Sequence, residues 1–249
     1  MLKKEYLCVT DDTDLTDDSL WNGQRYVIDR LATMLYYDLF QERIDKTEFK
    51  EIGMYGALAL LHDDRYRYFK QEVSEIVSYL LAHLEITTTP LGDEVLPCIE
   101  LYGCYTREEI FTLVGRQTLE KRMSGSVSGV FNLPEYDATL LFVTLNKSDK
   151  DFSPSTQYDD YVINKDYFHW QSKNTDAHHN RGGRIYTEQP QRHNKIVLFV
   201  REEKKDGFGN TCPFHCFGPV DYVSSHGDFP MNITWRLEQS VMPQYLKVV

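Results

Sequence analysis

The sequence predicts an α+β protein, in which a mainly helical N-terminal half is packed on a β-rich C-terminal half that forms a curled sheet or small barrel. Two observations lead to this prediction. Apolar residues recur at helical spacing through the first half, and they alternate with polar residues through much of the second half. Turn-forming Gly, Pro, Asn and Asp residues also cluster between the short apolar segments of the second half.

Four segments of the first half have the apolar spacing of amphipathic helices. The clearest is 66–85, whose apolar residues occur at i, i+3, i+4 and i+7 positions along one helix face. The first helix follows an acidic stretch, and Asp18 or Ser19 is a suitable N-cap. The last helix contains a capping-box pattern and is followed by Gly115, a typical C-cap residue. The predicted helices cover residues 20–39, 52–61, 66–85 and 106–114.

The second half contains segments that are short, apolar and rich in β-branched residues. The strongest predicted strands are 139–145 and 195–201, because both combine Val, Leu and Phe with few breaks. Further predicted strands are 183–188, 214–224 and 231–238. Short strands separated by turn signals favour a curled sheet or small barrel over a parallel β/α fold.

The change of period divides the chain into two parts. Residues 1–115 are predicted to form an acidic helical subdomain whose first 18 residues are flexible, and residues 133–249 a β-rich domain. Residues 116–132 join them, because the segment 124–129 reads Ser-Gly-Ser-Val-Ser-Gly. Residues 1–115 hold 11 basic and 22 acidic side chains, whereas residues 116–249 hold 16 of each. The net charge of −11 therefore belongs to the first half, and it argues against non-specific wrapping of long nucleic acids.

Composition and motifs exclude several classes of protein. No apolar run reaches the roughly 18–20 residues of a membrane helix, and the N-terminal residues lack the pattern of a signal peptide. Five cysteines without a disulfide spacing indicate the cytoplasm, so we expect no membrane contact. The chain has no P-loop sequence, and we expect no cofactor.

The side chains of the sequence offer two alternative metal sites, one for zinc and one for magnesium. A structural zinc site would use Cys98, Cys104, Cys212 and Cys216, but their spacing is not that of zinc fingers or ribbons. A magnesium-dependent nuclease would use Glu202 and Lys204 with a carboxylate from Asp159 or Asp160. The same Glu and Lys residues are also typical of an exposed hairpin end. The segment His178-His179-Asn180 also contains potential metal ligands, but it is interpreted as a solvated loop.

The segment 153–174 is the most unusual part of the chain, because it places aromatic rings beside amide groups. In an extended backbone Phe168 and Trp170 share one face, while His169 and Gln171 share the other. Aromatic faces can stack on bases, and amide groups can bond to base edges. The same residues can also form a core aromatic pair followed by a polar turn.

The motifs of the second half resemble those of a bacterial domain family of unknown function. The motifs that carry the resemblance are Phe152-Ser-Pro-Ser-Thr-x-Tyr-x-Asp160, Phe168-His-Trp-Gln-Ser-x-Asn174, Val197-Leu-Phe-Val-Arg-Glu202, Phe217-Gly-Pro-Val-x-Tyr222 and Pro230-Met-x-Ile-Thr-Trp-Arg-Leu237. The resemblance extends over roughly residues 50–249. Members of that family typically lie at the C-terminus of superfamily II (DEAD/DEAH-type) helicase proteins. A phospholipase-D-like nuclease domain often precedes the helicase, an arrangement that suggests restriction or phage defence.

The resemblance implies a module that works beside a superfamily II helicase module, in cis or in trans. We expect a DNA-recognition module without catalytic activity of its own, which binds duplex DNA and reads a modified or flipped base. The residues expected to form the walls of a base pocket and to contact the base edge are Tyr158, Phe168, Trp170, Gln171 and Asn174. The residues expected to contact phosphates are Lys147, Lys173 and Arg184.

Two alternative functions follow from the same sequence. The chain could be a structural or regulatory domain that packs on a helicase without touching nucleic acid, as its net charge favours. It could instead be the magnesium-dependent nuclease described above. Full burial of Phe168 and Trp170 among apolar side chains would contradict the predicted base pocket.

Overall fold

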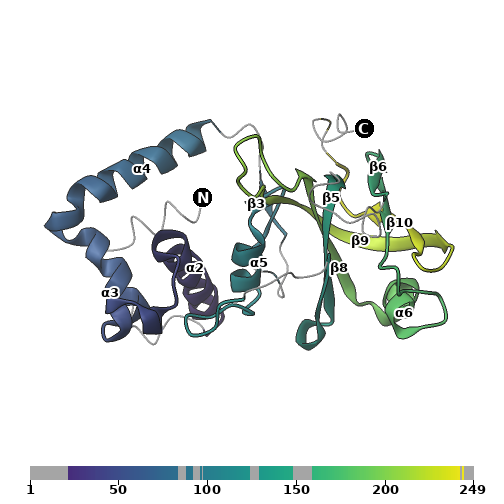
Figure 1. Cartoon of the computed structure of the whole chain (residues 1–249), viewed down its shortest axis with the longest axis horizontal. Coiled ribbons are helices and arrows are strands. Elements are labelled where there is room, and N and C mark those ends of the chain that lie inside the picture. Colours follow the sequence, from purple (N-terminus) through teal and green to yellow (C-terminus); the bar gives the residue numbers. More distant parts are fainter. Residues whose placement is uncertain are drawn as a thin grey trace. The chain divides into compact units, whose positions relative to one another are not determined.

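The described residues of the computed structural model form an α+β fold, with helices first and a mixed sheet after them (Figure 1). The structure describes residues 22–83, 88–91, 96, 98–123, 129–147, 159–241 and 243. They fall into two compact units. Unit 1 contains the described residues of Met1–Thr88, Gly92–Cys98 and Glu108–Ser124, and unit 2 contains those of Thr89–Leu91, Ile99–Arg107 and Gly125–Val249.

The helices of the structure confirm those predicted from the apolar spacing of the first half. The α-helices are α2 (Asn22–Phe40), α3 (Gly53–Ala59), α4 (Arg67–Ala82) and α5 (Arg107–Leu113). The short 3-10 turns are η1 (Ile44–Lys46), η2 (Glu48–Lys50), η3 (Leu60–His62) and η4 (Asp64–Tyr66). Gly115 follows α5 with a φ of 72°, as expected of a C-cap glycine. The predicted N-cap of the first helix lies outside the described residues.

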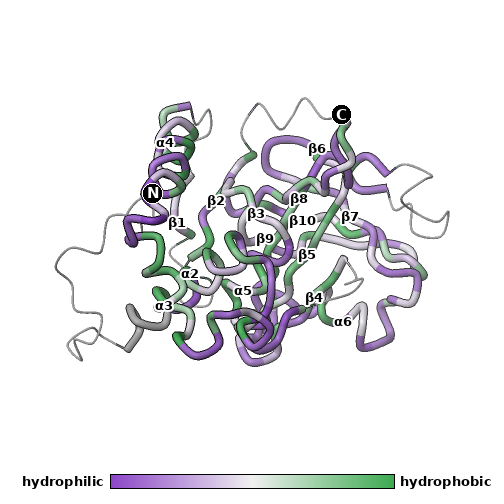
Figure 2. The backbone as a smooth tube through the Cα atoms, turned by 60° about the vertical axis from the view of Figure 1, so that its left-hand side comes forward, coloured by the Kyte–Doolittle hydropathy of each residue, from purple (hydrophilic) through white to green (hydrophobic). Residues whose placement is uncertain are grey.

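Unit 1 has a small core between α2 and α3. It contains Ala32 and Tyr36 from α2 and Met54 and Ala57 from α3, all buried. Helix α4 differs, because none of its residues is buried. Figure 2 shows hydrophobic and hydrophilic residues alternating along this helix. None of the described helices has the length and apolar character needed to cross a membrane.

The strands of unit 2 form one mixed eight-stranded sheet and one two-stranded sheet. The bounds are β1 (Thr89–Pro90), β2 (Glu100–Leu101), β3 (Cys104–Tyr105), β4 (Val130–Leu133), β5 (Ala138–Asn146), β6 (Tyr161–Asn164), β7 (Tyr167–Gln171), β8 (Lys195–Glu203), β9 (Phe214–His226) and β10 (Asn232–Leu237). The large sheet has the order β4-β5-β8-β9-β10-β7-β6, and β3 also pairs with β9. Strand β5 pairs with β8 in parallel, and the other paired strands of the large sheet are antiparallel.

The predicted curled sheet or small barrel is wrong. The sheet is open, because β4 and β6 end its strand order and no ladder joins them. The sequence could not show that the sheet is open. Strands β5 and β8 pair in parallel through a long connection, and the two strands within that connection, β6 and β7, lie at the far side of the sheet.

A second correction concerns the predicted strand 183–188, which lies in a helix. The segment Arg181–Thr187 forms α6, and α7 (Gln189–Arg192) and the 3-10 turn η5 (Pro134–Tyr136) complete the short helices of unit 2. The Asn180 side chain caps α6 by accepting a hydrogen bond from the Gly183 N–H at 3.0 Å. Gly182 and Gly183, whose composition is typical of a loop, therefore lie within the first helical turn of α6.

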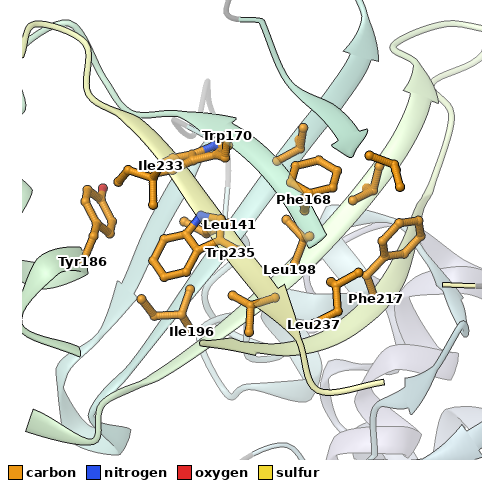
Figure 3. Close-up of a cluster of buried hydrophobic side chains, with 14 of the residues drawn as sticks. Leu141, Phe168, Trp170, Tyr186, Ile196, Leu198, Phe217, Ile233, Trp235 and Leu237 are labelled. Atoms are coloured by element: carbon orange, nitrogen blue, oxygen red, sulfur yellow. The ribbon is translucent and has the colours of Figure 1, made fainter. Parts of the chain in front are cut away.

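One large hydrophobic cluster stabilises unit 2. It takes side chains from each strand between β4 and β10 and adds Tyr186 from α6 (Figure 3). Trp235 of β10 is fully buried at 0% exposure, as the sequence predicted. The predicted strands 139–145, 195–201, 214–224 and 231–238 correspond to β5, β8, β9 and β10 and are confirmed.

Candidate nucleic-acid interface

The two rings expected to line a base pocket lie in the core. Phe168 is 0% exposed and Trp170 is 4% exposed. Trp170 packs edge-on against Tyr186 at 5.0 Å between ring centroids and contacts Trp235 at 6.3 Å (Figure 3). The two rings do share one face of β7, as predicted, but that face is the one buried against the sheet core. In this structure neither ring offers a face on which a base could stack. Tyr158, the third predicted wall residue, lies outside the described residues.

Lys147 lies in a buried ion pair instead of on an exposed surface. Its Nζ is 2.7 Å from Asp160 Oδ2, and the two side chains are 7% and 3% exposed. The other carboxylate oxygen of Asp160 accepts a hydrogen bond from the Gln171 backbone N–H at 2.8 Å. Burial raises the pKa of Asp160, and the nearby Lys147 charge opposes that rise. Lys147 therefore neutralises a buried carboxylate, which argues against its predicted role as a phosphate contact.

The Gln171 amide joins three parts of unit 2. Its Oε1 accepts a hydrogen bond from the Asp159 N–H at 2.8 Å, and its Nε2 donates to Asn232 Oδ1 at 2.9 Å. The neighbouring His169 Nδ1 is 2.8 Å from the Asp159 carbonyl oxygen, and its ring stacks on Tyr161 at 4.6 Å. Both ends of the Gln171 amide are thus used within the protein, which leaves it little capacity to read a base edge.

The remaining predicted residues lie around the segment that follows β7. This segment, the 172–180 loop, carries Lys173 and Asn174, and α6 follows it with Arg181 and Arg184. Asn174, Arg181 and Arg184 are exposed and Lys173 is half-buried. Arg184 donates to the His179 carbonyl oxygen at 2.9 Å, so it stays close to the loop. The side chains of Lys173 and Arg181 form no hydrogen bond or ion pair with any described residue.

The 172–180 loop is fastened to the turn between β9 and β10. That turn, Gly227–Pro230, is called the β9–β10 tip below. His178 donates to Asp228 Oδ1 from its backbone N–H, and its Nδ1 is also 2.8 Å from that oxygen. These hydrogen bonds from His178, the backbone one first, lower the pKa of Asp228. The Phe229 N–H donates to the Asp176 carbonyl oxygen at 3.0 Å.

The His178 ring continues this network on its other side. Its Nε2 is 2.7 Å from Ser225 Oγ, which is 2.7 Å from the Tyr222 hydroxyl. The order Ser-His-Asp is that of a hydrolase triad, but the His178 and Asp228 side chains are 41% and 40% exposed. Catalytic triads act in sites that restrict water. We therefore interpret the network as a structural connection between the loop and β9.

The sequence did not identify this connection. His178 and His179 were interpreted as part of a solvated loop, and Asp228 lies 50 residues further along the chain. The only available signal was the density of polar residues in 172–184, which includes three Lys or Arg residues and one Asp.

The zinc and magnesium sites, which the sequence offers only as alternatives, find no support among the described residues. No group of three or more His, Cys, Asp or Glu side chains in the described part of the chain could hold a metal ion. Of the four cysteines of the zinc alternative, Cys98 and Cys216 are buried, Cys212 is half-buried and Cys104 is exposed. The two carboxylate oxygens of Asp160, a candidate magnesium ligand, are bound to Lys147 and to the Gln171 N–H.

A family model described as "Domain of unknown function (DUF3427)" matches residues 99–248. The chain belongs to this family. The match confirms the family of unknown function that the motifs indicated, and association of this DUF3427 member with a helicase stays a prediction. No curated protein matches the chain by sequence.

The chain is also similar to a crystal structure of Arabidopsis thaliana SUVH6 in complex with SAM. The TM-score is 0.40 and the sequence identity 12%, over 90% of this chain and 41% of that chain. This chain therefore corresponds to less than half of the SUVH6 chain, and a likeness at this level carries no argument about function.

Proposed function

We propose that the chain is a non-catalytic DNA-recognition module that contacts duplex DNA through the 172–180 loop, the start of α6 and the β9–β10 tip. The observation that carries the proposal is that Lys173, Arg181 and Arg184 lie in the 172–180 loop and the start of α6, and that His179 of this loop contacts the exposed ring of Phe229. Cations bind backbone phosphates, and an exposed aromatic ring can contact bases. The base that the module reads is a modified or flipped one.

Charge supports this surface over the remainder of the molecule. The acidic excess of the chain lies in residues 1–115, whereas residues 116–249 are electrically balanced. Asp176 and Asp228 accompany the three cations, but each is already engaged. Asp176 accepts from the Tyr186 hydroxyl, and Asp228 accepts from His178. These hydrogen bonds leave both carboxylate charges in place, so the loop, the start of α6 and the tip carry three cations against two carboxylates, a net charge of +1. A small number of phosphate contacts is the expected binding mode.

The proposal can be tested by fluorescence anisotropy with labelled duplexes. The duplexes are unmodified or carry modified cytosine or adenine, and each is titrated across a salt series. We expect salt-dependent binding that is tighter for one modification. Arg181→Gln and Arg184→Gln should weaken binding to all duplexes similarly and reduce the salt slope by about one unit each.

A matched control is Arg65→Gln, which removes an exposed arginine of unit 1 that pairs with Asp63. It should leave both affinity and salt slope unchanged. Failure of the wild-type chain to bind any duplex at low salt would refute the proposal. Equal weakening by Arg65→Gln would show that binding is diffuse attraction and not recognition by the described surface.

Helix α4 supports the second candidate function, packing on a superfamily II helicase module. Phe69, Ile76 and Leu80 share one face of α4 and are 49%, 56% and 57% exposed. An apolar stripe of this spacing fits a hydrophobic groove on a protein partner. Tyr68 and Tyr79, which are 67% and 62% exposed, extend the apolar surface of the helix.

This second candidate is tested by titrating a purified helicase module with the chain and measuring complex formation by sedimentation. Ile76→Glu should abolish a complex that uses the apolar face of α4, whereas Gln71→Lys, a change at an exposed position on the opposite side of the same helix, should not. Complex formation that survives Ile76→Glu would exclude α4 as the contact. DNA binding and helicase packing involve different units, so either result leaves the DNA experiment decisive for unit 2.

A further inference from the structure

The β9–β10 tip presents a phenyl ring to solvent. Phe229 is 53% exposed, and its φ of 58° lies in the left-handed region that non-glycine residues rarely adopt. The following Phe229–Pro230 peptide bond is cis. A single exposed aromatic ring is common on protein surfaces, so the meaning of this one depends on its surroundings.

The backbone that carries the ring is held in place from several directions. The Phe229 N–H donates to the Asp176 carbonyl oxygen at 3.0 Å. Two residues further on, the Met231 N–H donates to Ser172 Oγ, and its carbonyl oxygen accepts from the Ser172 N–H, both at 3.0 Å. With the bonds from His178 to the neighbouring Asp228, these contacts fix the tip on both sides of the ring. The backbone that carries Phe229 is thus tied to the 172–180 loop on both sides of the ring.

The ring contacts a loop that carries cations. The His179 ring meets the Phe229 ring edge-on at 5.9 Å, and the Arg184 guanidinium binds the His179 carbonyl oxygen. Lys173 lies on the same loop, and its carbonyl oxygen accepts a hydrogen bond from the Asp176 N–H. The apolar ring therefore adjoins a loop and a helix start whose cations are suited to phosphate contacts.

We infer that Phe229 is an inserting side chain, which enters the stacked bases of a bound duplex and separates a base step. This inference rests on the proposed function and adds the mode of contact. Proteins that unstack DNA insert apolar side chains such as Phe while neighbouring cations hold the phosphates. Insertion needs a fixed backbone, because a ring on a mobile loop would lose entropy on binding, and the β9–β10 tip meets this requirement.

A second exposed phenylalanine provides the matched control. Phe208 is 94% exposed and lies in the turn between β8 and β9, at the opposite end of β9 from the β9–β10 tip. Its turn is organised by Asp206, whose carboxylate accepts from the Phe208 and Asn210 N–H groups. Exposure is therefore greater at Phe208, but its turn and the end of β8 carry three carboxylates, from Glu202, Glu203 and Asp206, against two lysines, and this negative excess opposes phosphate binding.

The test uses duplexes that contain 2-aminopurine, whose fluorescence increases when it leaves the base stack. The wild-type chain should raise this fluorescence on binding. Phe229→Ala should abolish the increase and weaken binding by about 5- to 100-fold, the range expected for loss of one aromatic–base contact. The salt slope should not change, because no phosphate contact is removed. Phe229→Leu, which keeps an apolar wedge, should retain part of the increase, and Phe208→Ala should behave as wild type.

The outcomes separate the inference from the proposed function. If Phe229→Ala binds and raises fluorescence as wild type does, insertion is refuted and DNA binding stands. If wild type binds with no fluorescence increase at any 2-aminopurine position, insertion is likewise refuted. If wild type does not bind DNA, the proposed function fails and the inference fails with it. Equal loss with Phe208→Ala would indicate general stickiness of exposed rings and would overturn the assignment to Phe229.

Discussion

Removal of one partner of the Lys147–Asp160 pair should destabilise unit 2 strongly. An exposed ion pair contributes about 0–1 kcal/mol, but these side chains are only 7% and 3% exposed. For a buried pair, loss of one partner costs about 3–5 kcal/mol, because the other charge is left without compensation. We therefore expect Lys147→Met to lower the free energy of unfolding by about 3–5 kcal/mol at pH 8.

The loss should depend on pH, with a defined sign. Burial already raises the pKa of Asp160, and removal of Lys147 removes the two largest contributions that oppose this rise. The folded state of the variant then holds a proton that the unfolded state releases at lower pH. Stability is therefore retained at pH values below the ordinary carboxylate pKa and decreases as pH rises toward the folded-state pKa, by up to about 1.4 kcal/mol per pH unit.

The assay is urea denaturation of each variant at pH 5 and pH 8. The double variant Lys147→Met/Asp160→Asn carries no buried charge, and its Asn oxygen can still accept from the Gln171 N–H, so it should recover most of the loss. If Lys147→Met does not fold at pH 8, the test is whether the double variant folds, and we expect that it does. Arg65→Met, which breaks an exposed pair with Asp63, should have little effect on stability, because solvent screens the two charges. Additive losses below about 1 kcal/mol in both single variants would refute the reasoning.

Three further predictions concern α6 and the cysteines. Gly183→Ala should lower the melting temperature clearly, because a Cβ there would lie 2.1 Å from the Ala177 carbonyl oxygen; an unchanged melting temperature would contradict this close approach. Asn180→Ala should cost about 1 kcal/mol in urea denaturation, since it removes the N-cap of α6. Asn180→Asp should recover only part of this loss, because it keeps the capping oxygen but loses the Nδ2 donor to the Thr175 carbonyl oxygen. Cys216 should resist alkylation at pH 8, because burial raises the pKa of its thiol to about 12, whereas the exposed Cys104 should react. Mass spectrometry of the labelled peptides measures the extent of alkylation at each cysteine. Equal labelling of the two residues would contradict the burial of Cys216.

The sequence predicted those elements whose apolar pattern is local. The helices and the four longest strands were found because burial of one face imposes a period on the residues themselves. The segment 183–188 was assigned wrongly, because Gly182 and Gly183 have the composition of a turn. In the structure, Gly183 is required by close packing of the α6 backbone against residue 177, and a packing requirement of this kind leaves no periodic signal.

The candidate site was harder to predict for the same reason. Alternation correctly placed Phe168 and Trp170 on one face of β7, but both faces of this strand carry aromatic or amide groups. Which face is buried depends on the partner strand, where Trp235 is paired with Phe168 and Ile233 with Trp170. Such long-range pairing cannot be read from the composition of β7 alone.

The parallel pairing of β5 with β8 has a consequence for how unit 2 folds. Ala138 and Lys195 are neighbours in this ladder although 57 positions separate them in the chain, and the connection between the two strands includes β6, β7, α6 and the 172–180 loop. Closing so long a connection costs entropy before any β5–β8 hydrogen bond forms, so refolding of unit 2 should be slow for its size. The 172–180 loop and the start of α6, two of the three parts of the surface proposed to bind DNA, therefore belong to this connection, and substitutions there are expected to change the refolding rate as well as affinity.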